Sequence, residues 1–225
     1  MKQLRFYFDV ISPYAWMAFE RLPLALQGIS HEVRWQPVLF AGLLEHHGQL
    51  GPAEIAPKRE WTYRQAGWLA RRLGLPMQRP AVHPFNPLPL LRLAVACAGP
   101  QGTPNRWVCE TLFRHVWTSG ENPEDPARLP DLVARLAPRR DPGSVEVKEA
   151  LRAATADAAA RGVFGVPTIE VDGRLFWGLD SLEMLREYLL GDPWFDGPGW
   201  EDAGLWQPGS VRRRRGAGPG QGESA

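Results

Sequence analysis

The chain has 225 residues, of which 44% are hydrophobic and 23% are charged, which is the composition of a globular protein with a sizeable core. The formal net charge of +1 argues against nucleic acid or an anionic membrane as a partner, because either would need a strong basic field. No apolar run approaches the length of a transmembrane helix, and the N-terminal residues lack the apolar core of a signal peptide. We therefore expect a cytoplasmic protein.

The first part of the chain predicts a strand, a helix and a second strand. Residues 4–9 are rich in aromatic side chains and are typical of a strand. Ser12 and Pro13 are residue types that begin helices, and apolar residues at helical spacing continue over 14–26. Val33 and Trp35 alternate with polar residues in a second strand. The order strand–helix–strand favours a parallel sheet.

The middle of the chain, from about residue 38 to residue 140, contains no strong strand pattern. Helical stretches are predicted near 58–73, 87–98 and 104–118, and glycines and prolines separate them. We interpret this block as a helical insertion.

Two cysteines, Cys97 and Cys109, lie in apolar, helix-like stretches of this block. They do not have the spacing of a Cys-x-x-Cys pair, so they indicate neither a disulfide framework nor a metal site. We interpret both as buried structural thiols, and the sequence predicts no bound metal.

The remaining pattern predicts a helix, a hairpin and a closing helix. The helix runs from about Val145 to Arg161, and residues 166–171 are typical of a strand. Asp172-Gly173 is a hairpin turn, and the return strand covers 174–177. The closing helix ends near Leu190.

This order of elements predicts an α/β protein with a thioredoxin-like fold that carries a large all-helical insertion. The thioredoxin-like domain would comprise residues 1–37 and 145–190, and the insertion residues 38–144. Residues 191–225 form a tail rich in glycine, proline and tryptophan that we expect to be partly disordered. The basic run at 212–215 within it is interpreted as solvated.

Ser12 is a candidate site residue because it lies where the first predicted strand meets the first predicted helix. Ligands of open α/β sheets bind beyond the carboxyl ends of strands, and a helix N-terminus there offers free N–H groups and a positive dipole end. These groups stabilise a thiolate, to which the Ser12 hydroxyl could donate a hydrogen bond. No Gly-x-Ser-x-Gly elbow surrounds Ser12, so it is not predicted to be a nucleophile. The alternative is that Ser12 only caps the helix.

Two later motifs could also bind a ligand. Pro167 opens a strand after a glycine loop and is a candidate for a cis peptide bond, which would leave the backbone of Val166 free to pair with a short peptide. The alternative is an ordinary trans proline at a strand edge. Asp180, near a helix start, could bind an ammonium group, or it could serve as an N-cap.

These motifs together resemble a known family. Residues 6–15, Phe-Tyr-Phe-Asp-Val-Ile-Ser-Pro-Tyr-Ala, closely resemble the opening of 2-hydroxychromene-2-carboxylate isomerases and kappa-class glutathione transferases. Residues 162–168 are similar to the family's cis-proline loop, 176–180 to its late glutathione-binding turn, and 83–89 to a helix entry in its insertion. The resemblance covers about residues 4–190. Disulfide oxidoreductases that share this architecture carry Cys-x-x-Cys at the position where this chain has Ser12-Pro13-Tyr14-Ala15.

The resemblance implies that glutathione is the cofactor and assigns residues to it. Ser12 would be the catalytic residue and would contact the glutathione sulfur, and Val166 would pair with glutathione through its backbone. Leu179 and Asp180 would hold the γ-glutamyl end. Gln49 lies near the position of a family asparagine, so it either replaces that asparagine or the contact is missing.

The resemblance also implies substrate contacts. Lys58 matches a family lysine near the pocket and would anchor the substrate carboxylate, unless it is a solvated surface lysine. Asn86 would line the pocket of the small aromatic substrate, unless it caps the following helix. A homodimer is implied by the resemblance alone.

The function implied is a glutathione-dependent isomerisation of 2-hydroxychromene-2-carboxylate or benzylidenepyruvate-type compounds by reversible thiolate addition. The first alternative is a kappa-like transferase that conjugates electrophiles to glutathione. A disulfide oxidoreductase is not supported, because the Cys-x-x-Cys motif is absent. The non-enzymatic alternative is a peptide-binding protein that keeps the cis-proline groove.

Overall fold

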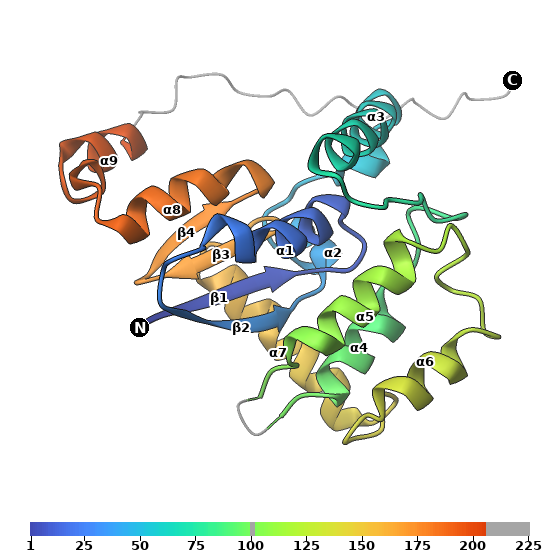
Figure 1. Cartoon of the computed structure of the whole chain (residues 1–225). Helices are drawn as coiled ribbons and strands as arrows, with labels where there is room; N and C mark the ends of the chain where they lie inside the picture. The colour runs from blue at the N-terminus through green and yellow to red at the C-terminus, as the bar shows by residue number, and fades with distance from the viewer. Residues whose placement is uncertain (100–101, 206–225) are drawn as a thin grey trace, which may run out of the picture.

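A mixed four-stranded sheet, in the order β2-β1-β3-β4, forms the centre of the computed structural model, which describes residues 1–99 and 102–205 (Figure 1). β1 and β2 are parallel, as the sequence predicts, and β3 pairs antiparallel with both β1 and β4. The strands are β1 (Lys2–Phe8), β2 (His31–Pro37), β3 (Thr168–Val171) and β4 (Arg174–Trp177).

The hairpin between β3 and β4 has the predicted two-residue turn. Asp172 and Gly173 both have positive φ angles, of 52° and 79°, as a type I′ turn requires. The turn brings β4 back beside β3, so the loops at the two outer ends of the hairpin lie close together. Gly178 N–H donates to the Pro167 carbonyl at 2.9 Å and ties these loops to one another.

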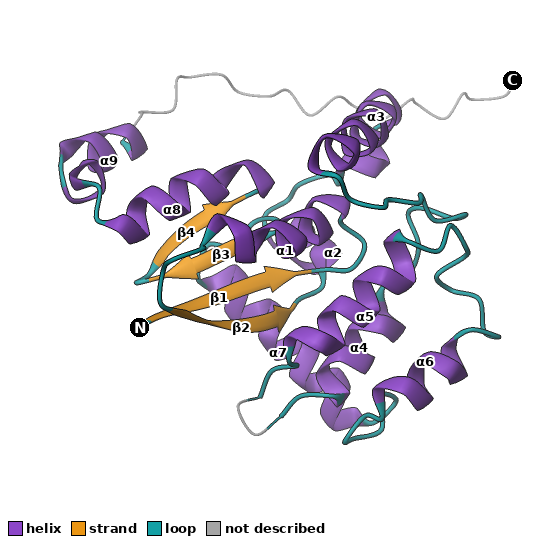
Figure 2. Ribbon diagram, in the orientation of Figure 1, coloured by secondary structure: helices purple, strands orange, loops and turns teal. Residues whose placement is uncertain are grey.

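Helices cover both faces of the sheet. α1 (Pro13–Ala25) and α8 (Leu182–Leu190) lie on one face, and α7 (Val145–Ala160) lies behind the sheet on the other (Figures 1 and 2). The strand–helix–strand opening and the hairpin followed by a helix confirm the predicted thioredoxin-like fold.

The predicted insertion between β2 and α7 contains only helices among its described residues. Its three predicted helices are present, and two further short helices were not predicted individually. Both of these are only seven or eight residues long, which is too short for a periodic pattern to stand out. The elements are α2 (Phe40–His46), η1 (Pro52–Glu54), α3 (Ala56–Leu73), α4 (Leu88–Ala96), α5 (Arg106–Trp117) and α6 (Leu129–Leu136).

Aromatic side chains join the insertion to the sheet. Phe113 of α5 packs against Phe8 of β1 and Phe19 of α1, with ring centroids 5.3 Å and 5.2 Å apart. Phe19 also packs edge-on against Trp35 of β2, at 4.9 Å. All these side chains are buried, so the insertion and the sheet share one hydrophobic core. The insertion is thereby fixed relative to the loop that follows β1.

The segment after α8 is ordered as far as the structure describes it. η3 (Pro193–Asp196) and α9 (Pro198–Gly204) pack on the outer edge of the sheet. Arg174 of β4 lies between the rings of Tyr188 and Trp200, with its guanidinium 5.1 Å and 5.2 Å from their centroids. The basic run at 212–215 lies outside the described residues. None of the described helices is long and apolar enough to span a membrane.

Candidate active site

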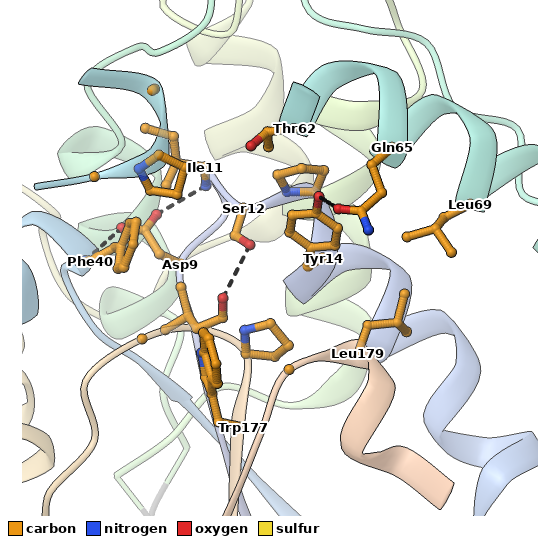
Figure 3. Close-up of a pocket in the computed structure, with 18 of the residues that line it drawn as sticks. Asp9, Ile11, Ser12, Tyr14, Phe40, Thr62, Gln65, Leu69, Trp177 and Leu179 are labelled. Atoms are coloured by element: carbon orange, nitrogen blue, oxygen red, sulfur yellow. Dashed lines mark hydrogen bonds between the residues drawn. The ribbon is translucent and has the colours of Figure 1, made fainter. Parts of the chain in front are cut away.

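A cavity of about 1320 Å³ lies beyond the C-terminal end of β1. Its lining residues come mainly from 9–14, 49–73, 83–87 and 164–183, four segments that are distant in the sequence. The position agrees with the rule that open sheets bind ligands beyond the carboxyl ends of their strands. Figure 3 shows the part of the cavity around Ser12.

Ser12 is the N-cap of α1 and lines this cavity. Its Oγ accepts a hydrogen bond from Ala15 N–H at 3.2 Å, so the capping role that the sequence left open is present. The same hydroxyl donates to the Val166 carbonyl at 3.3 Å (Figure 3). The cap and the cavity contact therefore coexist, because the oxygen accepts from the helix while the hydrogen points across the cavity.

The loop before β3 faces Ser12. The Val166–Pro167 peptide bond is cis, as the sequence predicts. The Val166 N–H has no hydrogen-bond partner among the described residues, and its carbonyl accepts from Ser12. Gly165 is needed here because a Cβ at this position would lie 2.6 Å from the indole Nε1 of Trp177. The loop thus presents a free backbone donor to the cavity beside Ser12.

Asp9 is a fully buried carboxylate at the end of β1. Its two oxygens accept hydrogen bonds from Ile11 N–H at 3.0 Å and from Phe40 N–H at 2.9 Å, so it joins the β1–α1 loop to the start of α2 (Figure 3). Burial raises the pKa of Asp9 to about 7, and these two N–H donors offset part of that rise. Asp9 was not predicted as a site residue, because an aspartate after a strand is usually exposed.

The far side of the cavity is largely apolar and belongs to α1, α3 and the start of α8. Tyr14 donates a hydrogen bond from its hydroxyl to Gln65 Oε1 of α3 at 2.8 Å (Figure 3). Burial raises the pKa of Tyr14, so the phenol is neutral at ordinary pH. The aliphatic and aromatic side chains of this wall include Trp61, Leu69, Leu73 and Leu182, and Phe85 and Leu179 extend it from neighbouring segments.

The structure brings four of the remaining predicted residues to the cavity. Leu179 and Asp180 line it from the short helix η2 (Leu179–Ser181), where Leu179 is half-buried and Asp180 is exposed. Gln49 and Lys58 line it from the insertion, and both are exposed at its rim. Because Asp180 and Lys58 are exposed and line the cavity, their carboxylate and ammonium groups can be reached by a ligand bound there.

Asn86 does not join these residues. It is not among the described residues that line the cavity, and its Oδ1 accepts a hydrogen bond from Leu88 N–H at 3.1 Å at the start of α4. It therefore makes the local cap that the sequence offered as the alternative to a substrate contact. Its neighbours Phe85 and Pro87 do line the cavity.

Two lining residues that the sequence did not assign are Tyr63 and His83. Tyr63 lies on α3, and the hydroxyl of Tyr63 is 2.8 Å from His83 Nδ1. His83 Nε2 in turn lies 2.8 Å from the Ile11 carbonyl, one residue before Ser12. The motif that begins at His83 was the one sequence signal for either residue. The contacts of His83 with Tyr63 and Ile11 join residues far apart in the sequence, so they leave no local pattern.

The fold and the cavity define a thioredoxin-fold protein in which a serine begins the first helix at the edge of the cavity. The chain belongs to the family of DsbA-like thioredoxin domains, whose family model matches residues 3–190. The match spans nearly the same residues as the resemblance that the sequence motifs indicated.

Individual relatives refine this placement. The chain is 27% identical over 208 residues to glutathione S-transferase kappa 1 of Rattus norvegicus, which covers 85% of this chain and 92% of the relative. It is 28% identical over 196 residues to 2-hydroxychromene-2-carboxylate isomerase of Sphingobium xenophagum, covering 84% and 98% of the two chains. Both names match the resemblance stated from the motifs.

A solved structure of 2-hydroxychromene-2-carboxylate isomerase superposes with a TM-score of 0.72 and covers 91% of this chain and all of that chain, at 23% sequence identity. This likeness confirms the predicted fold, including the helical insertion.

Proposed function

We propose that the protein is a glutathione-dependent isomerase of the 2-hydroxychromene-2-carboxylate type. The observation that carries the proposal is the hydroxyl of Ser12, which caps α1 and points across the cavity toward Val166. Relatives with this fold include an isomerase and a kappa transferase at nearly equal identity, which supports an enzyme of this group.

The donor set fits glutathione. Val166 offers an N–H group that has no hydrogen-bond partner within residues 1–99 and 102–205, which suits the backbone of a short extended peptide, and Asp180 offers a carboxylate for its ammonium group. The cavity of about 1320 Å³ leaves room for an aromatic acceptor beside the tripeptide. When bound, glutathione would supply a thiolate that adds reversibly to an activated double bond and is released unchanged.

The residues of the chain would hold the reacting groups. Ser12 would turn its hydroxyl hydrogen from the Val166 carbonyl toward the sulfur, and the N-terminus of α1 would favour the negative charge there. Lys58 would attract the carboxylate of the acceptor at the cavity rim, and the apolar wall of α3 would orient its ring.

The first test compares glutathione binding by wild type and Ser12→Ala, using calorimetry from about pH 6 to pH 9, where a thiol with a lowered pKa releases its proton. We expect binding with proton release in wild type. Loss of the hydroxyl should raise the bound thiol pKa by about one unit, because a hydrogen bond to an anion is worth about 1.5–3 kcal/mol and one to a carbonyl about half of that.

Ser144→Ala is the matched control. Ser144 caps α7 and accepts from Val147 N–H at 3.3 Å, so this variant also loses a serine cap but leaves the cavity intact. Both variants should lose roughly 0.5–2 kcal/mol of stability, and only Ser12→Ala should change proton release. Absence of glutathione binding in wild type would contradict the proposal and would favour the peptide-binding alternative.

The second candidate function is conjugation, which the kappa-class relative favours. The two activities differ in their mass balance. An isomerase regenerates glutathione with each turnover of a benzylidenepyruvate-type substrate, whereas a transferase consumes one equivalent per product. Measuring free thiol during turnover therefore separates them.

A further inference from the structure

The backbone of the β1–α1 loop is held by side chains from the helical insertion. Trp117 of α5 donates its indole N–H to the Val10 carbonyl at 2.9 Å. His83, in the segment before α4, lies with Nε2 2.8 Å from the Ile11 carbonyl. The next amide along, Ser12 N–H, donates to the Asp9 carbonyl at 3.1 Å. The peptide unit between Ile11 and Ser12 is therefore held at both its carbonyl and its N–H.

The partners of His83 define its tautomer. A backbone carbonyl only accepts hydrogen bonds, so Nε2 must carry the hydrogen that reaches Ile11. In the neutral ring Nδ1 is then an acceptor, and it faces the Tyr63 hydroxyl at 2.8 Å. The Tyr63 hydroxyl also lies 2.9 Å from the backbone carbonyl oxygen of His83. Whether its one hydrogen is donated to Nδ1 or to this carbonyl, the acceptor belongs to His83.

The surroundings of His83 keep the ring neutral and fixed. Its centroid lies 5.4 Å from Tyr63, 5.5 Å from Trp117 and 5.9 Å from Phe85. Burial lowers the pKa of His83, and the hydrogen bond to Ile11 opposes part of that shift. Arg59 and Arg79 act on the neighbouring Tyr63 phenol, where their positive charges oppose the rise in its pKa that burial causes.

We propose that His83 is a positioning residue for Ser12, and that through Tyr63 it connects the α3 wall of the cavity to the loop that holds the sulfur. By fixing the Ile11–Ser12 peptide, His83 fixes the direction from which the Ser12 hydroxyl enters the cavity. The inference rests on the proposed role of Ser12. It adds a residue that lies 71 positions further along the chain and belongs to the insertion.

This connection gives the insertion a part in the chemistry as well as in substrate binding. Tyr63 lines the cavity, so an aromatic acceptor that packs on α3 contacts the residue that holds His83. Any shift of Tyr63 changes the orientation of the imidazole and with it the Ile11 carbonyl. No covalent change or proton transfer is needed for this role, because each hydrogen stays on its own donor.

The test measures the thiol pKa of bound glutathione, by thiolate absorbance against pH, together with kcat and KM for a benzylidenepyruvate-type acceptor. His83→Leu removes the donor to Ile11 and should raise the thiol pKa and lower kcat about two- to tenfold, the worth of one hydrogen bond. His83→Gln keeps an N–H donor of similar reach and should restore most of both values. Tyr63→Phe should raise KM for the acceptor more than it changes glutathione binding.

His115→Gln is the matched control, because His115 also faces a backbone carbonyl, that of Pro123 at 3.4 Å, and does not line the cavity. It should leave the thiol pKa unchanged. If Ser12→Ala raises the thiol pKa and His83→Leu does not, the positioning role is wrong. If Ser12→Ala has no effect either, the proposed function itself fails.

A measurement without ligand keeps the inference testable if His83→Leu does not fold. The ¹⁵N shifts of the five histidines in the wild-type protein report which ring nitrogen carries the hydrogen. We expect His83 in the Nε2–H form, with an Nδ1 shift that changes in Tyr63→Phe. An Nδ1–H form, or an Nδ1 shift that does not respond to Tyr63→Phe, would overturn the proposed connection.

Discussion

Asp9 has an unusual environment for a carboxylate, since it is fully buried and has two N–H donors but no cationic partner in the part of the chain that the structure describes. Its pKa of about 7 lies above the value of 3.8 that it has when exposed. Between these two pH values the folded protein holds a proton that the unfolded chain has lost. The folded state is therefore favoured at the lower pH, and this contribution is lost as pH rises toward 7.

We expect the free energy of unfolding of the wild type to fall as pH rises from about 4 to about 7, with a slope of up to about 1.4 kcal/mol per pH unit from this group. Asp9→Asn should flatten that slope and should also lower stability at all pH values, because an amide offers only one acceptor oxygen to two N–H donors. Urea unfolding at a series of pH values measures both effects. A slope that is the same in the variant would show that Asp9 is ionised throughout.

Sequence patterns were enough to place the candidate residues whose signal is local. Ser12 before a proline and Val166 in the glycine–proline loop both lie where their motifs predicted, and they meet across the cavity. His83 and Asp9 could not be found in this way. Their roles depend on contacts with Ile11 and Phe40, and these contacts exist only once the insertion has packed against the sheet.

At the level of elements, α3 is a long helix with little support from the rest of the fold. Of its 18 residues, Ala66 and Ala70 are buried, and most of its large side chains face away from the core. Such a helix depends on its own propensity and on its ends. Gly74 supplies the end, in a left-handed conformation with φ of 67° that caps the helix.

This dependence gives a paired prediction. Gly67 lies inside α3 and a Cβ there would meet no atom within 4 Å, so Gly67→Ala should stabilise the protein by about 0.5–1 kcal/mol. Gly74→Ala should destabilise it by about 1–2 kcal/mol, because alanine adopts the left-handed conformation poorly. Thermal unfolding of the two variants measures both changes. Equal effects of the same sign would show that backbone propensity and the left-handed cap do not decide the stability of α3.

The bounds of the longer elements and of the short strand β4 were predictable, whereas the start of β3 and the helix α9 were not. The first two residues of the predicted strand, Val166 and Pro167, form the cis peptide bond of the preceding loop. β3 therefore begins at Thr168, two residues after the predicted start. α9 lies in a stretch where glycine, proline and tryptophan suggested a tail without a regular structure. Its helix is supported by tertiary packing of Trp200 against Arg174 and Phe195, which the local sequence does not reveal.

For the whole molecule, the order of the elements was enough to predict the fold, because a parallel strand–helix–strand unit and a late hairpin leave few ways to form one sheet. The way the insertion joins that sheet was not predictable. It depends on Phe113, which contacts Phe8 and Phe19 across about a hundred residues of sequence. The insertion is therefore part of the main core, although it interrupts the thioredoxin-like domain in the sequence.

A shared core predicts one cooperative unfolding transition. Tryptophan fluorescence and far-ultraviolet circular dichroism should give the same denaturation midpoint in wild type. Phe113→Ala should lower stability by about 3–5 kcal/mol while keeping the two midpoints together. Two separated transitions in wild type would show instead that the insertion unfolds independently of the sheet.

The hydrogen bond between the Ser12 hydroxyl and the Val166 carbonyl also bears on the selectivity of the site. A ligand that recruits this hydrogen must exchange one bond for another, so it gains only the difference between the two. A neutral thiol or thioether accepts hydrogen bonds weakly and would not win the exchange, whereas an ionised sulfur forms a charge-assisted bond about twice as strong. The Ser12 hydroxyl would thus favour the thiolate over its S-alkylated derivatives by charge, and would return to the Val166 carbonyl while the sulfur is bonded to the acceptor carbon.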